Sequence, residues 1–169
     1  MAAAIITMTL ASAVPALAAP GDTPMSLTLT GGSLSITVPT AAANLGTHVN
    51  TVAGGTISGP LGEVQVLDAR SPAAGSGWVA SAISTAFTPA SGPTIAASLV
   101  GYTAGPIVKV GTATYTANDP LALDGLVPVV TATGITGDNS ATWNPTINVG
   151  VAGGKAAGVY TATITHSVV

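Results

Sequence analysis

The chain has 169 residues, of which 47% are hydrophobic and only 5% are charged, and its formal net charge is −3. An ordinary soluble domain has about 25% charged residues, so uncharged polar groups must cover most of the exterior. The Lys and Arg residues are Arg70, Lys109 and Lys155, far apart in the sequence, which excludes the clustered cations of a nucleic-acid-binding surface. The absence of cysteine excludes disulfides and thiolate metal sites.

Residues 1–19 have the pattern of a secretory signal peptide. The stretch from Ala2 to Val14 is apolar, and Ala16-Leu17-Ala18 supplies small residues before the expected cut. The run is shorter than the ~20 apolar residues of a membrane-spanning helix, and no later stretch is better suited. The usual cationic start is missing, which leaves open a truncated signal or, alternatively, a buried first helix. We expect a secreted, extracellular protein with one domain over residues 20–169.

Residues 25–38, MSLTLTGGSLSITV, predict a hairpin that turns at Gly31-Gly32, since glycine accepts the positive φ of a tight turn. Folding there pairs apolar with apolar residues and hydroxyl with hydroxyl residues, and a slip of one residue would break the match. The predicted pairs are Thr30 with Ser33, Leu29 with Leu34, Thr28 with Ser35, Leu27 with Ile36 and Met25 with Val38.

Residues 62–68 and 78–84 predict a second hairpin, two strands joined by a loop of small residues over 70–77. Val64, Val66 and Asp68 alternate with Gln65 and Leu67, and this period of two indicates one buried and one solvated face. Before this pair, residues 39–60 predict a loop with one short strand near 56–58.

The remaining chain predicts further short strands between turns. Residues 94–102 suit an irregular strand or a short helix, and Asn118-Asp119-Pro120 is a strong turn signal. Pro128 places the strand 126–131 at a sheet edge. The other predicted elements are turns over 88–93 and 134–140, strands over 107–110 and 112–116, and a closing hairpin of 143–151 with 159–168.

Eight or nine short strands separated by turn signals predict an all-β fold, an antiparallel β-sandwich or barrel. The abundance of Thr and Val supports this class, because β-branched side chains fit a pleated surface. No stretch keeps a helical period over the ~10 residues that a helix needs.

Several segments of the chain resemble the WxL-domain surface proteins of Gram-positive bacteria, in particular their actinobacterial relatives. The resemblance covers residues 25–169 and is most specific in LGEVQVLDAR up to Arg70, at Trp78, and in GVYTATIT over 158–165. The two tryptophan–any–leucine positions of the family hold Trp78-Val79-Ala80 and His166-Ser167-Val168 in this chain. The resemblance implies an immunoglobulin-like β-sandwich that attaches non-covalently to the cell envelope.

Four residues are candidates for a binding site: Trp78, Asp68, Arg70 and Trp143. The two indole rings could form an exposed platform for sugar rings, but their place on apolar strand faces favours the core. Asp68 and Arg70 favour an ion pair or a backbone cap that holds the loop, because buried charge is tolerated mainly when paired. A polar contact from this pair to cell-wall glycan is the alternative.

The chain shows no pattern for catalysis, a metal or a cofactor. His166 lies on the apolar parity of the last strand, where a hydrogen-bonded interior or strand-end histidine is expected. A zinc site would need both His48 and His166 with an aspartate. Spaced acid pairs and a nucleophile elbow are also missing. We therefore do not expect an enzyme.

Two functions remain at the sequence level. The first is an envelope-associated domain that binds cell-wall polysaccharide, peptidoglycan or a companion surface protein. The second is a structural subunit of an extracellular fibre or surface layer, which self-associates through strand edges that few charged residues protect.

Overall fold

A computed structural model of the chain describes residues 25–72 and 74–169. The predicted signal peptide, residues 1–19, lies outside the described part. The described residues form antiparallel strands throughout, with one 3-10 turn at Ala97–Leu99 as their helical element, so the all-β prediction is confirmed. The strands are β1 (Leu34–Thr37), β2 (Gly55–Pro60), β3 (Val64–Asp68), β4 (Ser76–Ser84), β5 (Thr88–Pro89), β6 (Val100–Thr103), β7 (Val108–Ala117), β8 (Val127–Trp143), β9 (Thr146–Val151), β10 (Tyr160–Thr161) and β11 (Ile164–Val168).

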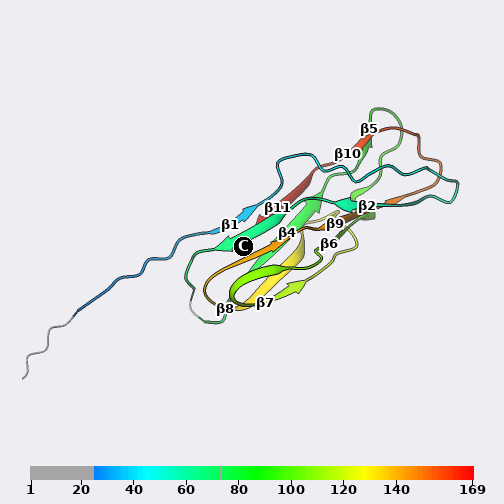
Figure 1. Ribbon diagram of the computed structural model, residues 1–169. Helices are drawn as coiled ribbons and strands as arrows, with labels where there is room; N and C mark the ends of the chain where they lie inside the picture. The colour runs from blue at the N-terminus through cyan, green and yellow to red at the C-terminus, as the bar shows by residue number, and fades with distance from the viewer. Residues whose placement is uncertain (1–24, 73) are drawn as a thin grey trace, which may run out of the picture.

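The larger sheet is built around β8, which has 17 residues. Along one side β8 pairs with β7. Along the other side it pairs with β3 over residues 139–143 and with β4 over 127–135, so β3 and β4 lie end to end as an interrupted strand. Outside them, β1 pairs with β3 and β11 pairs with β4 (Figure 1). The sheet edges are therefore β7 on one side and β1 with β11 on the other.

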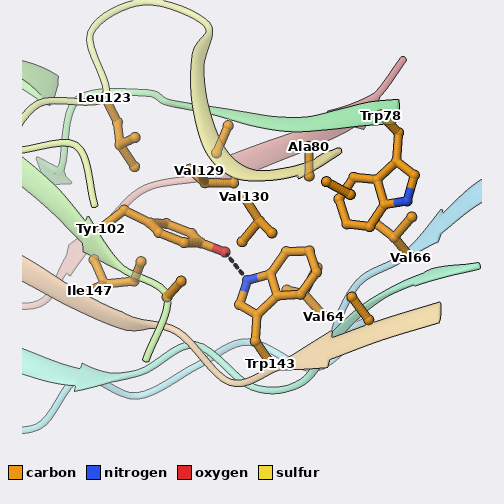
Figure 2. Packing of buried hydrophobic residues seen from close by; sticks show 14 of the residues in the cluster. Val64, Val66, Trp78, Ala80, Tyr102, Leu123, Val129, Val130, Trp143 and Ile147 are labelled. Atoms are coloured by element: carbon orange, nitrogen blue, oxygen red, sulfur yellow. Dashed lines mark hydrogen bonds between the residues drawn. The ribbon is translucent and has the colours of Figure 1, made fainter. Parts of the chain in front are cut away.

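A second sheet of three strands, in the order β2-β9-β6, packs on the first and encloses the core. Strands β5 and β10 form a separate pair. The core takes Val64 and Val66 from β3, Ile147 and Val149 from β9, and Tyr102 from β6. Figure 2 shows Val64, Val66, Tyr102 and Ile147 packed with both tryptophans. The observed architecture is thus a sandwich, and its described residues form nine strands of at least four residues and two of only two residues.

The predicted hairpin over 25–38 is wrong. Only Leu34–Thr37 forms a strand, and it pairs with β3, where Leu34 and Ile36 pack on the core. Met25, Leu27 and Leu29, the apolar residues expected to pair with this strand, are exposed and lie outside the core. The two glycines serve close approach instead of a turn: Gly32 N donates to Ala69 O at 2.5 Å, and a Cβ on Gly31 would lie 2.3 Å from Arg70 O.

The other two predicted hairpins are also wrong, although their strands exist. β3 and β4 follow one another along β8 and do not pair with each other. The closing segment divides among three places, because β9 joins the second sheet, β10 pairs with β5 and β11 pairs with β4. Alternation identifies a strand and its buried face, but it does not identify the partner strand. The partner depends on how apolar side chains from distant parts of the sequence pack together in the core.

The predicted turn over 134–140 and the predicted edge position of Pro128 are both overturned by β8. Gly134 and Gly137 have φ of 63° and 69° but lie inside this central strand, where they accompany shifts of register. Pro128 lies near the start of β8, beside the bulge between Ala80 and Ser81 of β4. A bulge is one of the few places where a sheet accepts proline.

The remaining predicted strands agree more closely with the structure. The strand near 56–58 is part of β2, and the two short strands over 107–116 are one strand, β7, with a register shift at Gly111, whose φ is 86°. Residues 94–102 combine both alternatives, because the 3-10 turn at 97–99 leads into β6.

Candidate functional site

Asp68 and Arg70 form a two-pronged ion pair at the break between β3 and β4. Arg70 Nε donates to Asp68 Oδ1 at 2.8 Å and Nη2 donates to Oδ2 at 2.9 Å, while the Arg70 backbone N–H donates to Oδ1 at 3.1 Å. Arg70 Nη2 also donates to the carbonyl of Gly77, across the loop. The predicted ion pair and backbone cap are therefore both confirmed, and they hold the loop closed.

Asn139 of β8 connects this ion pair to two aromatic rings. Its side-chain N–H donates to Asp68 Oδ2 at 3.4 Å, and its Oδ1 accepts from Trp78 Nε1 at 3.1 Å and from Tyr115 Oη at 3.2 Å. The hydrogen bonds from the Arg70 side chain are the main cause that lowers the pKa of Asp68, and burial raises the pKa of Tyr115. Asn139 and Tyr115 were not among the sequence candidates.

Both tryptophans lie in the core, with 2% of their surface exposed. The favoured core interpretation is confirmed, and the exposed sugar platform is wrong because neither ring has a face open to solvent. Asp68 is fully buried and its two oxygens are already bonded, so it offers no contact to a glycan. These residues position the strands.

A second polar chain crosses the sandwich from β8 through β6 to β11 (Figure 2 shows its first bond). Trp143 Nε1 donates to Tyr102 Oη at 2.8 Å, and Tyr102 Oη lies 3.3 Å from His166 Nε2. Because an indole can only donate, Tyr102 accepts from Trp143 and has its own proton to donate to His166. The expected hydrogen-bonded histidine is therefore confirmed, and it is partly buried. Burial raises the pKa of Tyr102.

His166 makes stability depend on pH. Burial lowers its pKa from 6.5 to about 4, so between these values the unfolded chain binds a proton that the folded chain does not. The contribution is complete above pH 6.5 and decreases as pH falls. We expect the free energy of unfolding to be about 2 kcal/mol lower at pH 5 than at pH 7.5. Urea titrations of the wild type and His166→Gln measure this, and equal pH slopes in both proteins would contradict it.

The outer face of the second sheet carries a row of uncharged polar side chains. Ser58 Oγ donates to Asn148 Oδ1 at 2.7 Å, and Asn148 Nδ2 donates to Thr103 Oγ1 at 3.2 Å. Asn148 and Thr103 line an open hollow of about 270 Å³, which exposed Leu99 and Leu121 border. The other lining residues are Thr56, Gly101, Tyr102, Pro120 and Gly150. None of these described residues is charged.

Sequence inspection did not identify this hollow. Gly101 and Gly150 leave the space: a Cβ on Gly101 would lie 3.5 Å from the Leu121 carbonyl oxygen, and one on Gly150 would lie 3.7 Å from Leu99. Among residues 25–72 and 74–169, no group of three His, Asp or Glu side chains could hold a metal ion. In the same part of the chain, no helix has the length and apolar character to cross a membrane.

The two segments at the tryptophan–any–leucine positions lie on adjacent strands. Trp78-Val79-Ala80 belongs to β4 and His166-Ser167-Val168 to β11, and Val168 lies opposite Ala80. This pairing places both segments in one part of the larger sheet.

The resemblance to WxL-domain proteins stays a prediction. Comparisons with protein-family models, with curated proteins and with solved structures each found no match for this chain.

Proposed function

We propose that this chain is a secreted, non-catalytic protein of the cell envelope that binds neutral cell-wall polysaccharide in the hollow on the β2-β9-β6 sheet. The observation that carries the proposal is the Ser58–Asn148–Thr103 row beside an open hollow lined by uncharged residues. The resemblance to WxL-domain surface proteins supports the location at the envelope.

The row keeps free hydrogen-bonding capacity for a ligand. An amide has two N–H donors and two acceptor lone pairs, and Asn148 uses one of each within the row. Thr103 accepts from Asn148 and retains its own O–H donor, and Ser58 retains acceptor lone pairs. A sugar hydroxyl is both donor and acceptor, so it can pair with adjacent members of this row.

The border of the hollow suits the apolar face of a sugar ring. Leu99 and Leu121 present exposed aliphatic side chains next to the polar row. Ligand sites commonly combine apolar surface with a few placed polar groups. The absence of charge from the described lining favours a neutral glycan over a phosphate-bearing polymer, whose recognition needs cations.

Retention of the protein on isolated Gram-positive cell walls tests this function. We expect the wild type to be retained and Asn148→Ala to lose about 1–3 kcal/mol of binding, or roughly 5–150-fold in affinity, because the row loses its central amide. The matched control is Thr136→Ala, which removes an exposed hydroxyl from β8, far from the row. Circular dichroism verifies that each variant is folded.

Two wall preparations distinguish the polymers. Whole walls contain peptidoglycan and its attached polysaccharides, whereas acid-extracted walls contain peptidoglycan alone. Retention on whole walls but not on acid-extracted walls would support the attached polysaccharide as the ligand. Equal retention on both preparations would assign the site to peptidoglycan. A wild-type protein that neither preparation retains, or equal retention of Asn148→Ala and Thr136→Ala, would refute the hollow as a glycan site.

A further inference from the structure

Residues 25–30 form an amphipathic arm that has no strand partner within the described residues. Met25, Leu27 and Leu29 are 92%, 91% and 84% exposed, and they alternate with Ser26, Thr28 and Thr30. Figure 1 shows the arm leaving the larger sheet as an extended chain, before β1. Soluble proteins rarely expose such a continuous apolar row unless it contacts another molecule.

The arm cannot join the nearest edge of its own domain. Its root is held where Gly32 N donates to Ala69 O. If the arm continued along the same edge, it would next reach β4. That place is occupied, because Val169 exchanges two backbone hydrogen bonds with Val79 of β4, at 2.8 and 3.1 Å. Strand β11 then continues along β4. The arm is therefore directed away from its own sheet.

Strand β7 offers an open edge with a pattern like that of the arm. Among the described strands it pairs only with β8, so alternate residues direct their backbone N–H and C=O groups outward. On the outer face, three threonines of β7 lie opposite three threonines of β8, as the pairs Thr112–Thr136, Thr114–Thr133 and Thr116–Thr131. On the inner face, Ala113 and Tyr115 pack against the core.

We propose that the arm of one copy of this chain adds as a strand to residues 112–117 of β7 in a second copy. The hydroxyl residues of the arm then form a third row beside the paired threonines. Its apolar residues extend the core next to Ala113 and Tyr115. A slip of one residue would place leucine beside threonine throughout, so the match selects a register in either strand direction. This association is independent of the glycan hollow, on the other sheet.

Charge also favours this half of β7. The arm and residues 112–117 contain no charged side chain, whereas the other half of β7 contains Lys109. A lysine on an edge strand opposes pairing with another chain. Main-chain hydrogen bonds supply the attraction in strand addition, and the alternating side chains supply its specificity.

Analytical ultracentrifugation over a range of protein concentrations tests the association. We expect the wild type to form dimers and longer chains as concentration rises, and L27D/L29D to weaken the association by at least about 100-fold, since two buried leucines are lost. The matched control is V49D/V52D, which changes two equally exposed valines in another loop and should associate like the wild type. A wild type that stays monomeric, or arm and control variants that associate equally, would overturn the proposal.

The absence of native cysteine allows a second test of the pairing itself. Thr28 and Thr114 are the central members of the two hydroxyl rows, so the proposed register places them opposite each other in either strand direction. Thr28→Cys in one protein and Thr114→Cys in another are therefore expected to form a mixed disulfide on mild oxidation, because directly opposed residues on one face have Cβ atoms about 4.5–5.5 Å apart. Leu27→Cys with Thr114→Cys is the control, since these side chains would lie on opposite faces. Cross-linking that does not distinguish the two combinations would exclude the proposed register.

Discussion

Trp78→Ala is expected to lower the free energy of unfolding by about 3–5 kcal/mol, the usual cost of removing a buried tryptophan. The indole is 2% exposed, packs 5.7 Å from the Tyr115 ring between centroids, and donates to Asn139 Oδ1. Its removal therefore leaves a cavity and takes a donor from the polar cluster. Urea unfolding at pH 7.5, followed by circular dichroism, measures the change.

Two variants control this measurement. Trp78→Phe keeps an aromatic ring in the core and loses the hydrogen bond to Asn139, so we expect it to lose less stability than Trp78→Ala. Val52→Ala alters a fully exposed side chain and should change stability by less than about 0.5 kcal/mol. If Trp78→Ala were as stable as Val52→Ala, the indole would not belong to the core. Loss of wall retention in Trp78→Ala would report unfolding and would not identify a binding residue.

Arg70→Met is expected to cost about 3 kcal/mol at pH 7, because it leaves the carboxylate of Asp68 buried without its cation. Methionine keeps an aliphatic chain in place of the arginine stem, so the change isolates the charge and its hydrogen bonds. Arg70 is partly exposed, which places the expected cost at the low end for a broken buried pair. Urea titrations of both proteins at pH 7 give the difference.

The cost of Arg70→Met should depend on pH. Asp68 has its pKa lowered from 3.8 mainly by the Arg70 side chain, so the pair stabilises the fold above this value and its contribution is lost as pH falls through the lower folded pKa. The difference between wild type and variant should therefore shrink below pH 3.8. Lys155→Met is the matched control. Among the described residues, Lys155 donates to the Thr94 carbonyl and to no carboxylate, and its loss should cost about 1 kcal/mol or less. Equal costs for both variants would contradict a role for the buried pair.

The fold class and the buried faces were predictable from alternation because side chains of a strand point to opposite faces in turn. Val64, Val66 and Asp68 are buried as expected, and Gln65 and Leu67 are exposed. The ion pair was predictable for a related reason: a carboxylate on an apolar parity requires a cation, and Arg70 is two residues away.

Strand pairing was not predictable from local matching. The alternation of residues 25–38 fits a hairpin, yet Leu34 and Ile36 gain more by packing on the core beside β3 than by pairing with the arm. The strict alternation of apolar and hydroxyl residues in the arm suggested the hairpin. In the described part of the fold, however, the arm has no strand partner.

The polar cluster and the hollow were missed for different reasons. Asn139 lies two and four residues before Ala141 and Trp143 on one parity of β8, so its burial was accessible from the sequence, but the predicted turn over 134–140 concealed it. The hollow combines residues of β2, β6 and β9. No local pattern brings these strands together.

The end-to-end placement of β3 and β4 has a consequence for the loop between them. Each segment is aligned by its own part of β8, so the connection between them can lengthen without disturbing either alignment. Hydrogen bonds join Ser71 to Asp138 and Pro72 to Gly137 of β8. A further hydrogen bond joins Gly75 to Ile135. An insertion between Pro72 and Gly75 would thus extend into solvent from a fixed base, at little entropic cost. A longer surface loop at this position is therefore compatible with an unchanged sandwich.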